Sequence, residues 1–397
     1  MAEGPWEQVS ETLEQHIQAH EITGGIVLIA RDGAIEYVEA LGTADEDPRP
    51  PLYPDTIVWM ASMTKPVVAT AVMMLAEKGR LHLDDVVSRY IPEFSEPRRV
   101  RTLRPGSPPP PPFPGPPPSP DAPKPEYDYA RAYRELTVRD FLTFRSGLQT
   151  IGIPNDDIPS VAPDDTLATW TAKLGRAALE FQPGTQWHYS NATGYEVLAR
   201  IVEVVSGQTF ADFLRERVFD PLGMNDTSFG LPLAENARVL PLGPMATMFM
   251  AGIIQGTFHS GSAGLFMTAE NYWRFAQMLL NEGELAGARI LTPESVRQMT
   301  RNQIGDIPMR GVRAAEYGAR DRVRHPGLGY GYGVAVLTDG QAADIGLPTG
   351  SYGWDGIGTR RFWVIPNTHT ILIMLMPGLG AAADATHRAI ERIVGQW

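Results

Sequence analysis

Ser62 and Lys65 are the two side chains in this sequence whose types and spacing best suit covalent chemistry. They lie three positions apart in the segment ASMTKP at residues 61–66, and Lys65 is one of only four lysines in the chain. Because positions i and i+3 share one face of a helix, the Lys65 amine can reach the Ser62 hydroxyl. A serine hydroxyl needs a base to become a strong nucleophile, and burial can lower a lysine pKa enough for that role. The alternative is a pair of surface side chains on an amphipathic helix.

A second motif, Tyr189-Ser190-Asn191, follows PGT at residues 183–185 and precedes a predicted helix. We therefore place it in a turn that displays its side chains. A tyrosine beside a serine–lysine pair can relay a proton or share the role of base. The asparagine can orient the lysine or bind a substrate carbonyl. The alternative is a turn asparagine next to a buried tyrosine.

A third segment, YGWDGIG at residues 352–358, leads into a predicted strand. Glycines allow the backbone to approach a ligand closely and to present an N–H group to a developing oxyanion. Taken alone, the segment equally fits a hairpin turn.

Composition and motifs exclude several other chemistries. The chain has 397 residues and no cysteine, so disulfide frameworks, zinc ribbons, iron–sulfur clusters and a cysteine nucleophile are excluded. Its eight histidines show no metal-ligand spacing, and we expect no metal and no cofactor. No Gly-x-Ser-x-Gly nucleophile elbow is present.

The charge and hydropathy of the chain argue against some classes of binding partner. The net charge of -12 and the pI near 5.2 argue against nucleic acid and anionic membranes as partners. No apolar run approaches the roughly 20 residues that span a bilayer. The polar N-terminus lacks the basic and apolar regions of a signal peptide, so we expect a cytoplasmic protein.

The periodicity of apolar residues predicts strands near both ends of the chain and helices between them. Predicted helices cover residues 6–20, 62–79, 136–142, 195–205, 268–282, 292–300 and 383–395. Predicted strands cover residues 25–30, 34–40, 331–337, 359–365 and 370–376, and Asp32-Gly33 has the composition of a type I′ turn.

This order predicts an α/β domain made of residues 1–90 and 240–397, interrupted by a mostly helical domain at 91–239. The helical domain contains a segment at 105–125 with 13 prolines in 21 positions. Proline fixes φ and lacks an N–H group, so we expect this segment to form an extended surface excursion. It is either a tolerated insertion or a lid or docking element.

Together the three motifs resemble the serine β-lactamase and penicillin-binding-protein superfamily, which shows SxxK, then Tyr-x-Asn, then a short motif on a strand. Further segments are similar to that superfamily: PGT at 183–185, PLGM at 221–224, SGSAGL at 260–265 and LTPESV at 291–296. The resemblance runs from about residue 8 to residue 395, with 105–125 as an insertion. It implies an α+β fold with a central antiparallel sheet flanked by helices and a mostly helical insert domain.

Within the superfamily the sequence most resembles the family VIII carboxylesterases, which have a class C β-lactamase fold. In β-lactamases and the related peptidases, the third motif begins with Lys or His followed by Thr-Gly, and the cation binds the substrate carboxylate. Here the matching residues are Trp354, Asp355 and Gly356. Trp354 fits the Trp-Gly-Gly common in family VIII and suits a neutral ester, whereas Asp355 departs from that pattern.

A second departure is FRSGL at residues 144–148, where relatives often read His-Thr-Ser-Gly-Leu. We interpret this segment as a structural turn.

The resemblance implies a carboxylesterase that hydrolyses short-chain or aryl esters through an acyl-enzyme on Ser62. It implies that Lys65 and Tyr189 act as general base and acid, and that the N–H groups of Ser62 and Ile357 form the oxyanion hole. The residues implied in substrate binding and oxyanion stabilisation are Asn191, Trp354, Asp355, Gly356 and Ile357.

Other activities remain open on the same residues. One is amide hydrolysis, by a β-lactamase, a D-amino-acid peptidase or an oligoamide hydrolase, and another is acyl transfer. An alternative of a different class is a non-catalytic ligand-binding homologue. The expected partner is a small-molecule ester, and the oligomeric state is left open.

Overall fold

The computed structural model describes residues 6–44, 50–109, 119, 122–148, 157–230, 238–242, 247, 258–309, 326–357, 359–377 and 381–397. Most of the proline-rich segment, residues 110–118 and 120–121, lies outside the described residues, as does Gly358. The expectation of an extended excursion at 105–125 therefore stays a prediction.

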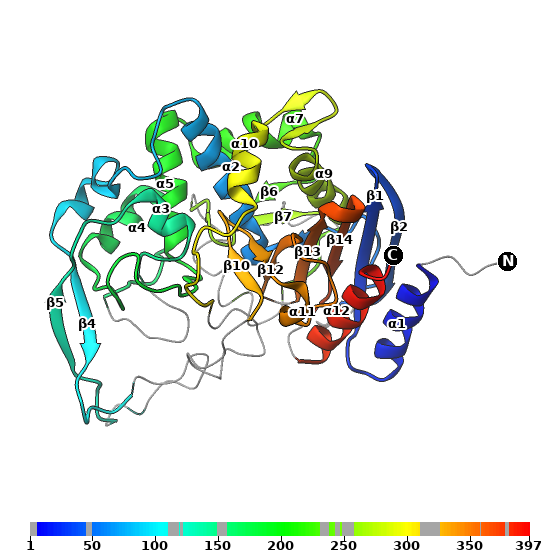
Figure 1. Cartoon of the computed structure of the whole chain (residues 1–397), viewed down its shortest axis with the longest axis horizontal. Coiled ribbons are helices and arrows are strands. Elements are labelled where there is room, and N and C mark those ends of the chain that lie inside the picture. The colour runs from blue at the N-terminus through cyan, green and yellow to red at the C-terminus, as the bar shows by residue number, and fades with distance from the viewer. Residues whose placement is uncertain are drawn as a thin grey trace.

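The centre of the molecule is a seven-stranded sheet with the strand order β10-β11-β12-β13-β14-β1-β2 (Figure 1). Every neighbouring pair is antiparallel, which confirms the expected fold class. Its strands are β1 Gly24–Arg31, β2 Ala34–Gly42, β10 Leu328–Tyr330, β11 Ala335–Leu337, β12 Tyr352–Gly356, β13 Arg360–Ile365 and β14 Thr370–Leu375. Strand β1 pairs with β14, so segments from the two ends of the chain lie side by side.

One predicted strand is wrong. The segment 331–337 is not a single strand, because β10 ends at Tyr330 and β11 begins at Ala335, with a hairpin turn between them. Gly333 in this turn has a φ of +85°, which a strand residue does not adopt. A Cβ on Gly331 would lie 1.9 Å from the Met299 carbonyl oxygen, so only glycine fits there. The apolar residues after the turn hid the break in the pattern.

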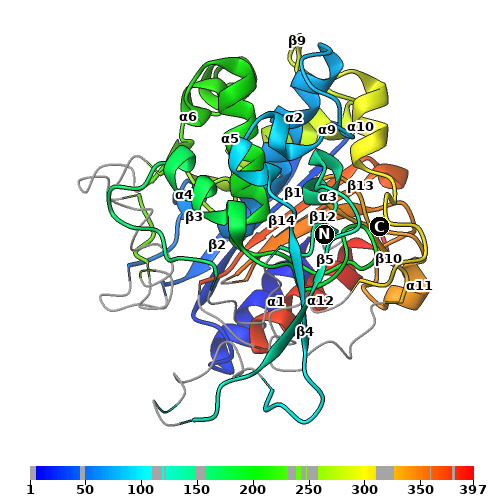
Figure 2. The ribbon, with the colours of Figure 1, turned by 90° about the vertical axis from the view of Figure 1, so that its left-hand side faces the viewer.

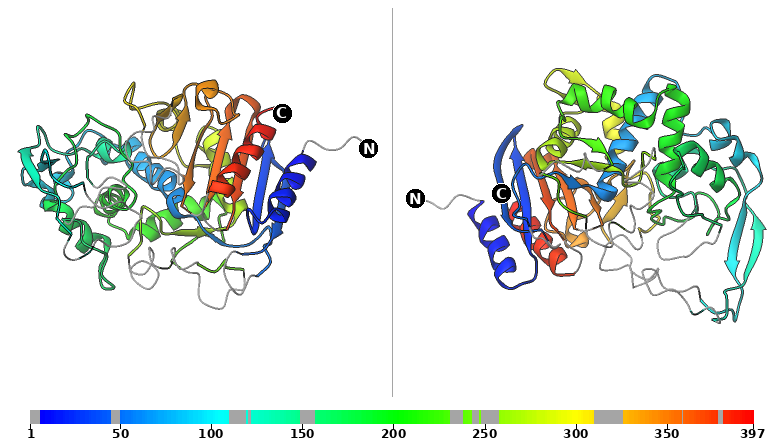
Figure 3. Two further views of the ribbon diagram at one scale, coloured as in Figure 1. Left: turned by 90° about the horizontal axis from the view of Figure 1, so that it is seen from below. Right: turned by 180° about the vertical axis from the view of Figure 1, so that it is seen from behind.

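Side chains alternate between the two faces of the sheet along each strand, and apolar side chains are buried on both faces. Helices therefore cover both faces. Helices α1 (Glu7–Gln18) and α12 (Ala381–Val394) cover one face, where Val27 of β1 and Trp363 of β13 are buried (Figure 3). Helices α2 (Thr64–Glu77) and α9 (Ala269–Leu280) cover the other face, where the main core includes Leu28.

A mostly helical region flanks α2 (Figure 2). Its helices are α3 Val138–Leu142, α4 Leu167–Lys173, α5 Gly194–Ser206, α6 Phe210–Leu214 and α7 Asp220–Leu222, with a π-helical turn at Arg215–Phe219. Short 3₁₀ turns lie at Val87–Arg89, Pro92–Ser95 and Leu174–Arg176. Helix α5 packs against α2, which brings this region next to Ser62 and Lys65. The domain boundaries at residues 90 and 240 stay a prediction.

The remaining elements are short. A three-stranded sheet has the order β3-β7-β6, and two-stranded ribbons form from β4 with β5 and from β8 with β9. These strands are β3 Val58–Trp59, β4 Arg99–Leu103, β5 Tyr127–Arg131, β6 Ser228–Phe229, β7 Leu265–Met267, β8 Glu284–Leu285 and β9 Ala288–Arg289. Two further helices in the described part of the chain are α10 Pro293–Met299 and α11 Gly340–Ala343, and a 3₁₀ turn lies at Pro366–Thr368. In the described part of the chain, no helix is long and apolar enough to cross a bilayer.

Candidate active site

Ser62 lies where the chain passes from strand β3 into helix α2. It is the middle residue of a 3₁₀ turn, Ala61–Met63, and its side chain is half-buried. Ala61 has a φ of +47°, an uncommon conformation for alanine, and it is fully buried. The end of β12 lies against this turn, because a Cβ on Gly356 would be 2.6 Å from the Met60 carbonyl oxygen and 3.4 Å from the Ser62 nitrogen. The turn and the strand therefore place the Ser62 amide beside the backbone of β12.

Lys65 lies in the first turn of α2 and has no solvent exposure. Its Nζ is 3.0 Å from Oγ of Ser62, which confirms the predicted proximity of the pair. Nζ also donates to two main-chain carbonyl oxygens, of Asn191 at 3.1 Å and of Ser262 at 2.8 Å. The amine is thus held by Ser62 from its own helix turn and by two residues that are distant in the sequence.

This arrangement suits Lys65 to act as a base. Burial lowers its pKa to about 7, while the negative charges of Glu196 and Asp355 act in the opposite direction. A neutral amine has two N–H groups and one lone pair. When the two carbonyl oxygens accept those N–H groups, the lone pair is left facing Oγ of Ser62.

Tyr189 contacts the same oxygen. Its hydroxyl donates to Oγ of Ser62 over 2.6 Å, and its ring lies 5.2 Å from Nζ of Lys65. The Tyr189 side chain is buried, whereas Ser62 stays partly exposed, so a substrate can reach this contact from the Ser62 side. The structure therefore brings Ser62, Lys65 and Tyr189 together as the sequence predicted.

An aromatic cluster surrounds Tyr189. Phe144 contacts the Tyr189 ring edge-on at 4.9 Å between centroids, and Trp354 does so at 5.4 Å. The same cluster includes Trp187, Tyr195 and Tyr330. Phe144 lies at the centre of this cluster, and its φ of +52° is typical of a turn. The residue that we interpreted only as part of a turn therefore also packs against Tyr189.

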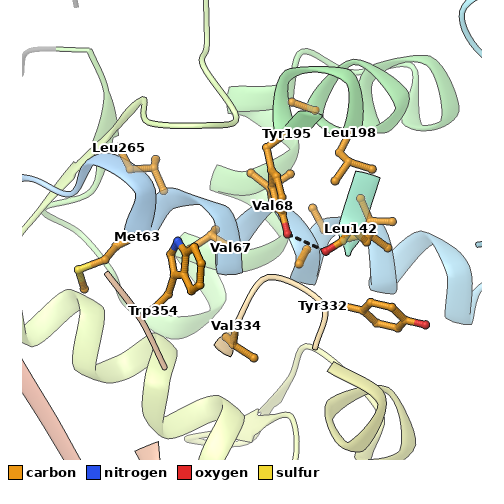
Figure 4. Packing of buried hydrophobic residues seen from close by; sticks show 14 of the residues in the cluster. Met63, Val67, Val68, Leu142, Tyr195, Leu198, Leu265, Tyr332, Val334 and Trp354 are labelled. Carbon is orange, nitrogen blue, oxygen red and sulfur yellow. Dashed lines mark hydrogen bonds between the residues drawn. The ribbon is translucent and has the colours of Figure 1, made fainter. Parts of the chain in front are cut away.

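The three residues of the third motif face two sides of the sheet. Trp354 belongs to the main core and lies against α2 beside Met63 and Val67 (Figure 4). Asp355 is the next residue along β12, so its side chain points to the opposite face. There it lies 4.0 Å from Arg361, which also binds two carboxylates of α12, Asp384 and Glu391. The Asp355 carboxylate therefore faces α12 and not Ser62, and its implied part in substrate binding stays a prediction.

The other two predicted site residues, Asn191 and Ile357, also lie close to Ser62 and Lys65. Asn191 contacts Lys65, as one of its two predicted roles requires, but it does so through its main-chain carbonyl, which accepts from Lys65. Ile357 directly follows Gly356 and is half-buried beside the Ser62 turn. Within the described ranges, no group of three histidine or acidic side chains is placed to hold a metal ion.

The family model described as Beta-lactamase matches residues 9–395 of the chain. The chain belongs to the beta-lactamase family. This confirms the predicted membership of the serine β-lactamase and penicillin-binding-protein superfamily, and it makes the chain a serine hydrolase of the beta-lactamase family by descent.

Relatives of this beta-lactamase family protein carry several names. An uncharacterized protein of Mycobacterium tuberculosis is 29% identical over 92% of this chain and 88% of its own length. Esterase EstB of Burkholderia gladioli is 28% identical over 90% of this chain and 86% of its own length. The solved structure of EstCE1, a hydrolase with promiscuous acyltransferase activity, covers 98% of both chains with a TM-score of 0.71 and 22% identity. That structural likeness supports the fold.

Sequence reasoning missed Glu196 and Ser262. Glu196 is a charged residue in the otherwise apolar stretch that begins helix α5, and this isolation was a usable signal. Ser262 lies in SGSAGL, which was noted only as a family segment.

Proposed function

We propose that this protein is a carboxylesterase that hydrolyses neutral short-chain or aryl esters through an acyl-enzyme on Ser62. The observation that carries the proposal is the pair of contacts on one oxygen: Tyr189 Oη at 2.6 Å and Lys65 Nζ at 3.0 Å from Ser62 Oγ. A nucleophile in contact with both a candidate base and a candidate acid fits acyl transfer.

In the proposed acylation, Oγ of Ser62 attacks the ester carbonyl and its proton passes to Lys65, with Tyr189 assisting. The oxygen that becomes negative is stabilised by the N–H groups of Ser62 and Ile357, on either side of the close contact between Gly356 and the Ser62 turn. As the ester C–O bond breaks, the leaving alkoxide takes a proton from Tyr189, which regains one from Lys65. A water molecule then releases the acyl group by the reverse proton route.

Trp354, the first residue of the third motif, is the basis for proposing an uncharged substrate. Trp354 occupies the position of the cation in β-lactamases and peptidases, and its ring is buried among aromatic side chains. An indole offers no charge to bind a carboxylate, so a neutral ester fits better than an anionic substrate. The relative EstB is named an esterase, which supports an ester as the substrate class.

The first test compares turnover of short-chain p-nitrophenyl esters by wild type and Ser62→Ala. In parallel, a serine-directed phosphonate and intact mass spectrometry show whether a single adduct forms on Ser62. We expect turnover and one adduct in wild type and neither in the variant. Unchanged ester turnover in Ser62→Ala would falsify the proposal.

A chromogenic cephalosporin assayed with the same protein separates an esterase from an amide hydrolase. Rapid cephalosporin hydrolysis with negligible ester turnover would favour the amide-hydrolase alternative. Added alcohols that divert the product would indicate acyl transfer. A protein that neither labels nor turns over substrate would favour the ligand-binding alternative.

A further inference from the structure

Glu196 is a buried carboxylate to which sequence analysis assigned no role. It lies in the first turn of α5 and is 2% exposed. All three of its hydrogen bonds come from one turn: from Oγ of Ser260 at 2.5 Å, from the Gly261 N–H at 2.6 Å and from the Ser262 N–H at 3.2 Å. A fully buried acid with such partners is uncommon and calls for a physical reason.

The three partners are all donors. The two backbone N–H groups can only donate, and Oγ of Ser260 already accepts from the Ala263 N–H at 3.1 Å, so its own proton points to Glu196. Burial is the largest effect and holds the pKa of Glu196 above its ordinary value, although these hydrogen bonds and the charge of Lys65 act to lower it. Three donors around two oxygens fit the ionised carboxylate.

The turn itself is fixed closely against α5. A Cβ on Gly261 would lie 2.4 Å from the Tyr195 carbonyl oxygen and 2.8 Å from the Cβ of Ala199, so the turn can approach α5 this closely only because residue 261 is glycine. This contact and the hydrogen bonds of Glu196 act on the same three residues. The turn is therefore held in one position relative to α5.

Ser262 connects this turn to the reaction. Its N–H donates to Glu196, and its carbonyl oxygen accepts from Nζ of Lys65 at 2.8 Å. One residue thus links the buried carboxylate to the candidate base. Any movement of the turn changes the direction in which the Lys65 lone pair points.

The charged and titratable groups around Lys65 come from several elements. Glu196 on α5 has the largest effect among the acids that raise its pKa, and Asp355 on β12 has a smaller one. The phenols nearby are Tyr189, Tyr195 and, further along the aromatic cluster, Tyr330. Among the described residues, Glu196 is therefore the principal counter-charge of Lys65.

We propose that Glu196 is a positioning residue: it fixes the turn 260–262 so that the Ser262 carbonyl aims Lys65 at Ser62, and its carboxylate is the buried counter-charge that Ser262 links to the Lys65 amine. The inference rests on the proposed function, because it assumes that Lys65 activates Ser62. Glu196 acts through Ser262 and does not touch the reacting atoms.

The test is the pH dependence of Ser62 phosphonylation in Glu196→Gln, measured by intact mass. Removing the negative charge disfavours protonated Lys65, so the midpoint of the rate against pH moves down by about one unit. The rate on the alkaline plateau falls by about tenfold or more, because an amide cannot accept all three hydrogen bonds. Phosphonylation requires no ester turnover.

Glu391→Gln is the matched control. Glu391 is equally buried, but it lies on α12 and binds Trp363 and Arg361 on the far face of the sheet. This variant loses stability and keeps the wild-type midpoint. The proposal is overturned if Glu196→Gln keeps the wild-type midpoint. A phosphonylation rate that is lowered by the same factor at every pH is such a result.

If Glu196→Gln does not fold, Ser260→Ala tests the positioning role of Glu196 instead. It keeps the charge and removes one donor, so the plateau rate falls while the midpoint stays near that of wild type. A wild-type plateau rate in this variant overturns the proposal. A wild type that labels at Ser62 but hydrolyses no ester refutes the proposed function and leaves the Glu196 comparison intact, whereas absence of labelling at Ser62 refutes both.

Discussion

The hydroxyl of Tyr189 donates a hydrogen bond of 2.6 Å to Oγ of Ser62, although the two residues are 127 positions apart. Lys65 reaches the same oxygen from within the first turn of α2. Each of the two groups can therefore exchange a proton with Ser62 without moving. The two contacts can be tested separately, because one depends on the phenol of Tyr189 and the other on the amine of Lys65.

Replacing Tyr189 with Phe removes the hydroxyl and keeps the ring that packs between Phe144 and Trp354. We expect kcat for ester hydrolysis to fall by about 10²–10⁴, with little change in melting temperature. Tyr195→Phe is the control, because the Tyr195 hydroxyl donates to the Leu142 carbonyl at 3.1 Å and the ring is also buried beside Lys65. Equal losses of kcat in the two variants would contradict a specific role for Tyr189.

Lys65 should titrate near neutrality, because burial lowers its pKa to about 7. The chain has only four lysines, so lysine labelled with ¹³C at Cε gives a four-signal NMR spectrum in which Lys65→Met identifies one signal. The base form exists above the pKa, so the rate of Ser62 phosphonylation should rise as the pH increases through about 7. A Lys65 signal that titrates near the ordinary lysine pKa of about 10.4 would refute this role.

The sequence was sufficient for the part of the site that depends on local geometry. Ser62 and Lys65 meet because i and i+3 share a helix face, and this holds wherever the helix packs. Tyr189 could be placed only through the resemblance, because no local rule joins residues 127 positions apart. The direction of Asp355 follows from strand alternation once Trp354 is known to face the core, but that fact comes from the tertiary structure.

Contacts made by backbone groups were the hardest to foresee. The carbonyls of Asn191 and Ser262 accept from Lys65, and a main-chain carbonyl is present in every residue, so its use leaves no trace in the sequence. The wrongly predicted strand at 331–337 has a similar cause. Its two turn glycines are required by close packing and by a positive φ, and neither shows in the apolar pattern.

Replacing Gly356 with Ala should push the backbone of the third motif away from the Ser62 turn. The added Cβ would lie 2.6 Å from the Met60 carbonyl oxygen and 3.2 Å from the Cβ of Ala61, and backbone on one side cannot move aside cheaply. We expect a loss of about 1–3 kcal/mol in the free energy of unfolding and a fall in kcat greater than the change in KM. Gly25→Ala is the control, because its Cβ meets only the flexible side chains of Leu13 and Met376. The same fall in kcat in both variants would show that stability alone explains it.

Asp355→Asn tests the direction in which the third motif presents its side chains. Because the carboxylate lies beside Arg361 on the face that α12 covers, we expect KM for neutral esters to stay within about twofold of wild type. The lost charge also disfavours protonated Lys65, so the midpoint of Ser62 phosphonylation should move to lower pH, by less than in Glu196→Gln. Trp354→Leu provides the contrast, because Trp354 packs edge-on against Tyr189 and its loss should change KM and kcat together. A several-fold rise in KM for Asp355→Asn, with an unchanged midpoint, would instead place its carboxylate in the substrate pocket.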